Sequence, residues 1–459
     1  MAEHSVTVEN TLQTLLTDKK YSTIRDILVT MNPADIAAVF SGVEPDKQPL
    51  LFRLLPKELA AESFVEMESE EQESLIRGIS DKELRQVMDE LYVDDAVDIV
   101  EEMPANVVQR ILAQADPEMR KEINEILQYP EDSAGSVMTT EYVKLTPDMT
   151  VGDAILRIRR TGVDKETIYT CYVLQNRLLV GTVSVKSLLL APSDLQTIDS
   201  IMDTNLITVS THTDQEEVAQ MMSKYNLLAI PVVDSDNRMV GIVTFDDAMD
   251  VVEEETTEDM EIMAGMTPSD KTYLRSSPLD LFIHRIPWLS LLMISATFTG
   301  MIISGFEKAL ASMTCLAAFI PMLMDTGGNS GSQSSVTVIR ALSLGELEFS
   351  DLGKVIWKEI RTALICGACL SVLCFAKVML VDRLLMGNEE VSIMVAVVVG
   401  LTLAVTVLCA KLVGCTLPML AKKLGFDPAV MASPFITTIV DALSLLVYFG
   451  IATSLLKIA

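Results

Sequence analysis

The chain is poor in the residues that most enzymes use for chemistry. It contains only three histidines, His4, His212 and His284, and no nucleophile stands near them at the spacing of a catalytic pair or a metalloprotease motif. Seven cysteines are present, and the one C-x-x-C, Cys366 to Cys369, lies in a hydrophobic run without a second pair. The sequence therefore gives little support to an enzyme, a disulfide framework or a cysteine metal site.

Positive charge is scarce in the first part of the chain. Residues 1–270 hold 52 Asp and Glu against 21 Lys and Arg, a net charge of −31, whereas residues 271–459 hold 12 against 14, a net charge of +2. An acidic surface argues against nucleic acid and anionic lipid as partners. It suits cation binding, with plain solubility as the alternative. The first ten residues are polar and do not resemble a signal peptide, so we expect the acidic part to stay in the cytoplasm.

Residues 1–130 are predicted to form an all-α N-terminal domain. Helix-start signals recur about every twelve residues. Ser69 and Ser80 are each followed three residues later by Gln or Glu, which is the spacing of a capping box. A regular series of short amphipathic helices is typical of a superhelical stack, and an ordinary helical bundle is the alternative.

Residues 131–255 contain an internal repeat. Residues 137–146 recur at 201–210, and residues 180–184 recur at 240–244, which predicts strand, helix, strand, strand and helix in each copy. This pattern resembles a tandem pair of α/β CBS domains. In that family a Gly-x-x-Thr-x-x-Asp segment holds an adenine nucleotide, so the resemblance implies ATP as a candidate cofactor of the second copy. Its binding residues are Gly241, Thr244 and Asp247. The first copy has Ser187 instead of the Asp, and a purely structural pair is the alternative.

Residues 246–275 are predicted to contain an acidic connecting helix. Its carboxylates recur at steps of three and four residues, which places them in one stripe along the helix. A divalent cation or a facing basic surface would relieve the repulsion between them, and a solvated linker helix is the alternative. The stripe consists of Asp247, Asp250, Glu254, Glu258 and Glu261.

Residues 276–459 are predicted to form an α-helical membrane domain of five transmembrane helices. The expected spans are residues 287–305, 310–339, 356–380, 391–420 and 428–455. Lys and Arg are more frequent at the helix ends that a cytoplasmic start places inside. We therefore expect a multi-pass protein of the plasma (inner) membrane with its C-terminus outside. Five spans are few to enclose a path, which favours a homodimer with the path on its axis.

The last of these spans carries Asp441 near its middle. A carboxylate at bilayer depth costs roughly 2.5–3.5 kcal/mol, which indicates a function such as a cation site inside a pore. Pro434, Thr437 and Thr438 lie within two turns of Asp441 on the same side and are predicted to line that pore. Asp427 lies at the mouth of the helix, roughly 21 Å from Asp441 at 1.5 Å per residue.

The second span is also polar, with a Gly-Gly-Asn-Ser-Gly-Ser-Gln sequence. Such residues are tolerated at bilayer depth where helices pack closely or line a cavity. Asn329 and Gln333 share one helix face and are predicted to contact the waters of a hydrated ion. Hydrogen bonding between helices is the alternative.

The order of domains and the two polar membrane segments, residues 321–333 and 427–441, resemble the MgtE family of magnesium channels and transporters over essentially the whole chain. The resemblance implies a homodimer in a lipid bilayer that conducts Mg²⁺ into the cytoplasm, with Asp441 of both subunits on the axis. It implies that Asp427 shares an ion with Asp259, so that the connecting helix plugs the pore. It also implies closure by cytosolic Mg²⁺ at sensor carboxylates. These are Glu62, Asp94, Asp98, Asp214, Glu216, Asp247, Asp250, Glu255 and Glu258.

Two residues depart from the family pattern, and other functions remain open. Asn226 stands where a sensor Asp can occur, and Asp325 stands where a small residue is usual. The main alternative is a CBS-regulated transporter or channel for another ion or solute, and a second is a sensor whose membrane half is only an anchor. An anion path would not carry Asp441, and an anchor would not need Asn329 and Gln333 at bilayer depth.

Overall fold

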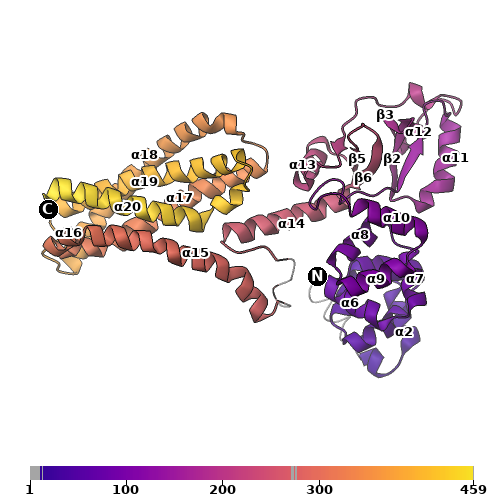
Figure 1. Cartoon of the computed structure of the whole chain (residues 1–459), viewed down its shortest axis with the longest axis horizontal. Coiled ribbons are helices and arrows are strands. Elements are labelled where there is room, and N and C mark those ends of the chain that lie inside the picture. The colour runs from indigo at the N-terminus through magenta and orange to yellow at the C-terminus, as the bar shows by residue number, and fades with distance from the viewer. Residues whose placement is uncertain (1–10, 13, 270–272, 274–275, 458–459) are drawn as a thin grey trace. The chain divides into compact units, whose positions relative to one another are not determined.

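The structure is a computed structural model, and it describes residues 11–12, 14–269, 273 and 276–457 (Figure 1). The chain divides into two units, Met1–Val252 and Glu253–Ala459. The first unit contains a helical domain followed by two small sheets, and the second contains a bundle of long helices. Each unit has hydrophobic cores of its own, so each is described separately.

The helical domain consists of short helices that pack on their second neighbours in the chain, such as α3 on α5 and α7 on α9. The capping box predicted at Ser80 is present, with Glu83 as its partner. The box predicted at Ser69 is absent, because Ser69 is already helical and its hydroxyl donates to the Glu102 carboxylate. The helices are α2 (Tyr21–Leu28), α3 (Pro33–Ser41), η1 (Pro45–Lys47), α4 (Gln48–Phe52), α5 (Lys57–Val65), α6 (Ser69–Gly78), α7 (Asp81–Met88), α8 (Val93–Glu102), α9 (Ala105–Gln114) and α10 (Pro117–Ile126).

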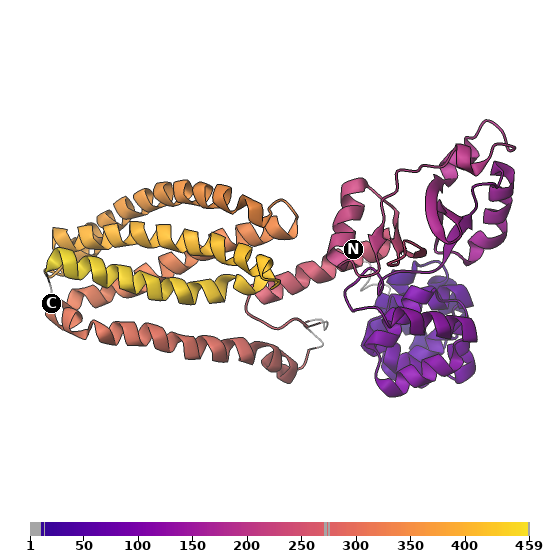
Figure 2. The same cartoon turned by 45° about the horizontal axis from the view of Figure 1, so that its top comes forward.

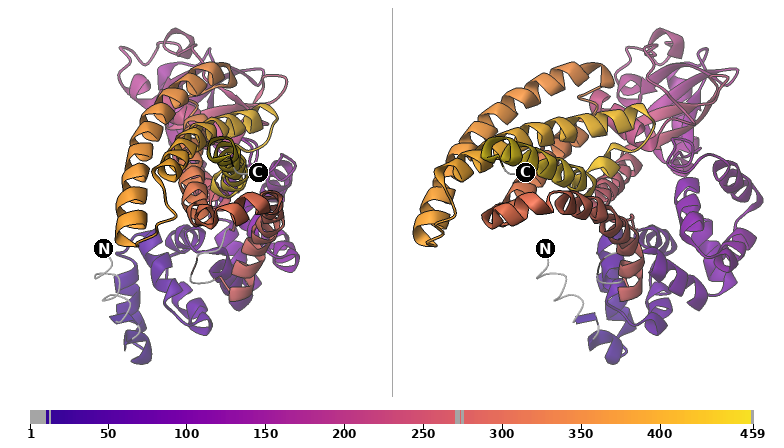
Figure 3. Two further views of the ribbon diagram at one scale, coloured as in Figure 1. Left: turned by 90° about the vertical axis from the view of Figure 1, so that its left-hand side faces the viewer. Right: turned by 60° about the vertical axis from the view of Figure 1, so that its left-hand side comes forward.

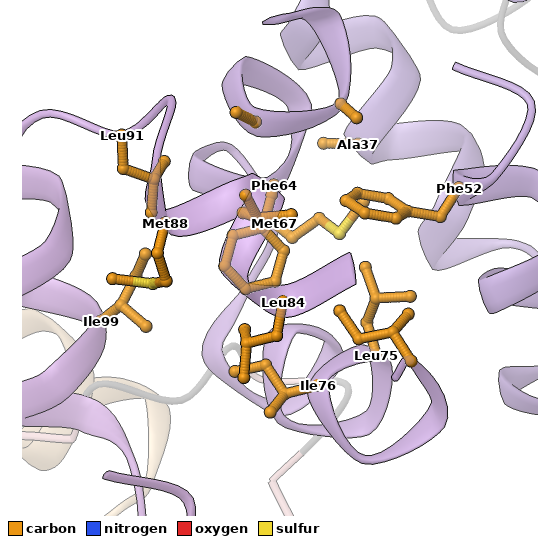
Figure 4. Close-up of a cluster of buried hydrophobic side chains, with 14 of the residues drawn as sticks. Ala37, Phe52, Phe64, Met67, Leu75, Ile76, Leu84, Met88, Leu91 and Ile99 are labelled. Atoms are coloured by element: carbon orange, nitrogen blue, oxygen red, sulfur yellow. The ribbon is translucent and has the colours of Figure 1, made fainter. Parts of the chain in front are cut away.

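One continuous core, from Leu12 to Ile126, holds these helices together. Figure 4 shows the part around Phe64, with Met67 and Leu84 beside it. The Phe64 ring is 1% exposed, and it meets the Phe52 ring edge-on with 6.3 Å between the centroids. Because each short helix buries only one face, the stability of the domain depends on this shared core.

The repeat folds as predicted into two three-stranded sheets, ordered β1-β2-β3 and β4-β5-β6. In each, the first strand runs parallel to the second, and the second and third are antiparallel. The first copy comprises β1 (Tyr142–Leu145), α11 (Val151–Thr161), η2 (Gly162–Asp164), β2 (Thr167–Gln175), β3 (Leu178–Ser184) and α12 (Val185–Leu189). After η3 (Ile198–Ser200), the second comprises β4 (Val209–Ser210), α13 (Gln215–Tyr225), β5 (Ala229–Val233), β6 (Met239–Thr244) and α14 (Phe245–Met263).

Glycines allow the segments at the start of each copy to cross over the other copy. Thr139 pairs with Ile242, and Thr182 pairs with Asp203. A Cβ atom on Gly241 would lie 2.7 Å from the Met138 sulfur. Gly241, which the sequence analysis assigned to nucleotide binding, is therefore required for the contact between the copies.

The second unit is a bundle of long helices that run alongside one another (Figures 2 and 3). The connecting helix α14 ends at Met263, before the predicted boundary at residue 275. The second predicted span is not one helix but α16, η4 and α17. The elements are α15 (Pro278–Gly305), α16 (Glu307–Ser312), η4 (Thr314–Phe319), α17 (Ile320–Ser343), η5 (Phe349–Asp351), α18 (Leu352–Lys377), the π-helix η6 (Val378–Leu385), α19 (Ile393–Lys423), η7 (Pro428–Met431) and α20 (Ser433–Leu456).

Four helical stretches of the described residues are long and apolar enough to cross a membrane. They are Pro278–Gly305, Phe349–Leu385, Ile393–Lys423 and Pro428–Leu456. Helix α17 has 24 residues, which is also long enough to span, but its amides, serines and glycines lower its hydropathy. It packs against both α19 and α20.

Glycines bring α17 into backbone contact with its neighbours. A Cβ atom on Gly414 of α19 would lie 2.3 Å from the Gly331 carbonyl oxygen of α17, and one on Gly328 would lie 3.1 Å from Thr437 of α20. Such close approach increases dispersion contact and allows polar groups of one helix to reach the next. The polar helix is thereby embedded between two apolar ones.

The shared core of the helical domain predicts a strong effect for Phe64→Ala. The substitution should lower the free energy of unfolding by about 3–5 kcal/mol, because it leaves a cavity among rings that cannot collapse freely. Urea unfolding of residues 1–130, followed by circular dichroism, measures it. Val29→Ala, at a side chain that is 46% exposed, is the control and should change stability by less than about 1 kcal/mol.

Candidate permeation site and acidic clusters

Asp441 lies where α17 and α20 are in closest contact. Its neighbour Val440 is buried against the two α17 glycines Gly327 and Gly331. Because successive residues of a helix point in different directions, the half-buried Asp441 lies at the edge of this contact. Asp325 of α17 lies close enough to act electrostatically on the Asp441 carboxylate. Two carboxylates from different helices therefore share one environment.

Asp325, Asn329 and Gln333 form one exposed stripe on α17, at steps of four residues. The Asn329 amide nitrogen donates to Asp325 Oδ1 at 3.1 Å. This bond orients the Asn329 side chain along the stripe. The face that carries Asn329 and Gln333, as the sequence predicted, also carries Asp325, whose role the sequence did not show.

The predicted pore-lining threonines bind their own helix. The hydroxyls of Thr437 and Thr438 donate to the Pro434 carbonyl at 3.0 and 3.1 Å. Pro434 lies in the first turn of α20. Each hydroxyl keeps oxygen lone pairs that can accept a hydrogen bond from a hydrated ion.

Asp259 and Asp427, to which the resemblance assigned a shared ion, lie near each other at one end of the bundle. Asp259 accepts a hydrogen bond from the Ser343 hydroxyl at 3.3 Å. Its pKa is raised, first by burial and then by the Asp427 carboxylate. Asp427 caps η7 by accepting from the Ala429 amide at 2.7 Å.

The end of α14 packs against the same end of the bundle. Ile262 and Met263 contact the small cluster formed by Ile339, Ala429 and Ala432. The chain then turns at Gly265, which has a φ of 74° and lies against Pro434. The end of α14 and the turn that follows it therefore lie against η7 and the first turn of α20.

In the first unit, α8 meets the start of α14 through carboxylates. Asp94 is 6% exposed, and its Oδ1 has no hydrogen-bond partner among the described residues. Asp247 acts on Asp94 and Asp98, both of which the resemblance named. Asp247 itself binds the Thr244 backbone amide at 3.3 Å and the Thr244 hydroxyl.

Two further carboxylates belong to this cluster that the sequence analysis did not find. Glu166, directly before β2, acts on Asp94, and its own Oε2 is buried without a partner among the described residues. Glu141 accepts a hydrogen bond from the Val93 amide at 3.3 Å, at the start of α8. Neither residue stands in a charge run, so no sequence signal distinguished it. We call Asp94, Asp95, Asp98, Glu141, Glu166, Asp246 and Asp247 the α8 cluster.

Burial raises the carboxyl pKa values of five members of the α8 cluster, and repulsion from neighbouring carboxylates raises them further. The pKa of Asp95 is raised to about 7, that of Asp98 to about 8, that of Glu166 to about 8 and that of Asp247 to about 6. The pKa of Asp94 is also raised well above its ordinary value. The fold therefore keeps these carboxyl groups close together although their charged forms repel one another.

A second acidic group lies near Asp214. Asp214 caps α13 by accepting from the Glu216 amide at 2.9 Å, and it raises the pKa of Asp132 after burial and Glu131. Glu216 accepts from the Gln220 side chain at 3.1 Å. Glu62 lies on the exposed face of α5, and Asn226 closes α13 with a left-handed φ of 52°. That conformation favours Asn over most residues.

The remaining carboxylates of the acidic stripe extend along α14. Asp250, Glu254 and Glu258 are exposed and Glu255 is half-buried, while Glu261 accepts a hydrogen bond from the Ser269 amide. Among the described residues, no group of three or more His, Cys, Asp or Glu side chains is arranged to hold a metal ion.

Sequence profiles of known families match most of the described residues. A profile described as a divalent cation transporter matches residues 320–451. The MgtE intracellular N domain matches residues 31–132, and CBS domains match residues 134–194 and 198–254. With four candidate spans, these matches define a membrane transporter of divalent cations with a CBS pair.

Full-length relatives identify the family. The magnesium transporter MgtE of Thermus thermophilus is 36% identical over 451 residues, which cover 97% of this chain and 98% of that protein. The magnesium transporter MgtE of Bacillus subtilis is 33% identical over 441 residues, covering 96% and 95%. The chain belongs to the MgtE family of magnesium transporters.

Solved structures resemble the first unit. The crystal structure of the cytosolic domain of the Mg²⁺ channel MgtE in complex with ATP has a TM-score of 0.51 and 35% identity, and covers 53% of this chain and 99% of that one. The soluble part of a magnesium transporter has the same TM-score with 28% identity, and covers 56% and 99%. The predicted helical domain and CBS pair are confirmed by these matches.

From the α8 cluster we predict that the contact between α8 and the start of α14 weakens as pH rises when divalent cations are absent. The carboxyl pKa values of Asp94, Asp95, Asp98, Glu166 and Asp247 are raised in the folded protein, so the folded contact binds more protons than the unfolded chain between about pH 4 and 8. Stability is thus present at low pH and is lost as pH rises through the folded pKa values. Asp98 should contribute less than its raised pKa alone implies, because its side chain is exposed and water screens its charge.

Amide hydrogen exchange of α8 in the full chain, in EDTA and corrected for intrinsic rates, measures this effect. Protection should be greater at pH 6 than at pH 8, and Asp94→Asn should reduce the difference. Protection that rises with pH would contradict the electrostatic reading. Glu118→Gln, at an exposed residue of α10, should leave the pH dependence unchanged.

Proposed function

We propose that this protein is a homodimeric Mg²⁺ channel or transporter that imports Mg²⁺ into the cytoplasm and is closed by cytosolic Mg²⁺. Membership of the magnesium transporter family gives the cargo. The observation that supports the path is the pair of carboxylates Asp325 and Asp441, which share the exposed rim of the α17–α20 contact with the Asn329 amide.

The donor set fits a hydrated Mg²⁺ ion. Mg²⁺ dehydrates reluctantly and keeps several waters in an octahedral shell, so it is recognised well by oxygen groups that contact those waters. Carboxylates of Asp441 and Asp325, with the Asn329 and Gln333 amides, supply such groups. Their mutual repulsion favours a divalent ion over a monovalent one, because two charges neutralise it more completely.

A second copy of the chain would complete the path. Asp325, Asn329 and Gln333 are exposed on α17, although polar groups at bilayer depth avoid lipid. A twofold axis beside this stripe would bring two sets of carboxylates and amides face to face. This arrangement supports Asp441 of both subunits as one site on the axis.

We propose that α17 is the fifth span. With α15, α18, α19 and α20 it makes an odd number of crossings, so a cytoplasmic N-terminal half implies a C-terminus outside the plasma (inner) membrane. Positive charge supports a cytoplasmic position for the start of α18 and the end of α19. Lys358 and Arg361 lie near the first of these ends, and Lys423 lies at the second.

Closure is proposed to depend on the acidic groups. Glu62, the α8 cluster, Asp214, Glu216 and the α14 carboxylates Asp250, Glu255 and Glu258 would hold regulatory Mg²⁺. The orphaned Asp94 and Glu166 oxygens support this for the α8 cluster, because a buried oxygen without a partner favours a cation. Shifting a two-state gate from 1:99 to 99:1 needs about 5.5 kcal/mol of differential binding, which several weakly bound ions can supply together.

The plug is proposed to act at Asp259 and Asp427. Their electrostatic contact supports a shared cation, which would hold α14 over the mouth of the bundle. When that cation leaves, the two carboxylates repel and α14 is free to move. ATP at Thr244 and Asp247 of the second CBS copy is a further proposal, supported by the solved relative in complex with ATP.

The conduction site predicts loss of transport in Asp441→Ala. Removal of the carboxylate should lower Mg²⁺ uptake into proteoliposomes about tenfold or more, because a charge at bilayer depth is replaced by an apolar wall. Glu389→Gln, in an exposed loop, should retain normal uptake. Normal uptake by Asp441→Ala would exclude this residue from the path.

The gate predicts reduced Mg²⁺ sensitivity in Asp94→Asn/Asp98→Asn. The internal Mg²⁺ concentration that half-closes the channel in patch-clamp recordings should rise about tenfold, within the usual range of coupling between sites. Conductance at low internal Mg²⁺ should be unchanged, since the path is intact. Unaltered sensitivity would show that the α8 cluster is not a sensor. Glu118→Gln serves as the matched control.

A further inference from the structure

A buried ion pair lies inside the helix bundle, apart from the residues of the proposed path. Lys411 of α19 and Glu359 of α18 face each other with 3.8 Å between Nζ and Oε2, and their side chains are 7% and 15% exposed. Lys411 lies twelve residues before the end of α19, about 18 Å from it at 1.5 Å per residue. Ionisable residues that are buried between membrane helices are rare and often mark functional positions.

Ser334 of α17 joins this pair. Its hydroxyl, which is 2% exposed, donates to Glu359 Oε2 at 2.8 Å and also lies 3.4 Å from the Lys411 carbonyl oxygen. Glu359 therefore receives an ionic partner from α19 and a hydrogen bond from α17. The three helices therefore meet in one polar contact inside the bundle.

The contact lies beside the tightest packing in the bundle. Gly414, three residues after Lys411, would place a Cβ atom 2.3 Å from the Gly331 carbonyl oxygen, and Gly331 lies three residues before Ser334. A Cβ atom on Gly331 would lie 3.2 Å from the Ala410 carbonyl oxygen. A contact made by glycines alone would allow α17 to rotate or slide on α19. The hydrogen bond of Ser334 requires a defined geometry, so it favours one rotation of α17.

Ser334 follows Gln333 directly and lies five residues after Asn329. A helix turns by 100° per residue, so any rotation at Ser334 moves both amides by the same angle. We propose that the Glu359–Lys411 pair, acting through Ser334, fixes the rotation of α17 and so positions the Asn329 and Gln333 amides in the Mg²⁺ path. Glu359, Lys411 and Ser334 are positioning residues, and this role rests on the proposed function.

The test compares uptake of Mg²⁺ by proteoliposomes containing Ser334→Ala and Glu359→Gln/Lys411→Met. The double variant removes both charges together and leaves no unpaired charge in the bundle. Each should lower uptake about tenfold, which corresponds to an ordinary coupling between contacting residues. Size-exclusion chromatography of the detergent-solubilised protein reports whether each variant is folded. Ser332→Ala, at a half-buried residue of the same helix, should keep normal uptake.

A double-mutant cycle separates positioning from a general loss of structure. In an Asn329→Ala/Gln333→Ala background, Ser334→Ala should cause no further fall, because the groups that it positions are gone. Falls that multiply would overturn the proposal, as would normal uptake by folded Ser334→Ala. If the double variant does not accumulate, Ser334→Ala decides the result, since it keeps both charges. Absence of Mg²⁺ uptake by proteoliposomes that contain the unsubstituted protein would instead refute the proposed function itself.

Discussion

The close packing of α17 between α19 and α20 is the constraint on which the membrane unit depends. This helix carries carboxamides, hydroxyls and Asp325, so it cannot face lipid on every side. Its glycines let the backbones of α19 and α20 approach until only a glycine fits at Gly331 and Gly414. Small residues thus replace the hydrophobic effect, which does not drive helices together in lipid. The same contact determines which face of α17 stays open, and that face carries the Asp325–Asn329 pair beside Asp441.

Repulsion between carboxylates is the second feature that organises the protein, and it occurs in both units. In the first, burial and like charge raise the pKa values of Asp95, Asp98 and Glu166 in the α8 cluster. In the second, Asp427 acts on Asp259 at one end of the bundle. In both places the carboxylates repel one another, and binding of protons or divalent cations would reduce that repulsion. A family that transports Mg²⁺ therefore has, in its own cargo, the ligand that relieves the repulsion.

Much of the fold could be predicted because local signals agreed with the final packing. The repeat gave the strand and helix order of both CBS copies, since each copy is an alternation of short, strongly patterned segments. The Ser80 capping box formed, whereas Ser69 bonds to Glu102 from α8 instead, a contact far along the chain that no local spacing encodes. The second span was predicted as one helix, but η4 interrupts it before Ile320, because hydropathy averages over a break in backbone direction.

By itself the sequence determined the family, the division into acidic and membrane halves, and the presence of costly charges such as Asp441, because composition and motif spacing are properties of the chain alone. Only the tertiary structure decided several of the charge pairings. Asp325 with Asp441, Glu166 with Asp94, and Glu359 with Lys411 are each far apart in sequence. Their pairing depends on helix rotation and on glycine contacts between helices, and electrostatic energy depends on the distance in space rather than along the chain.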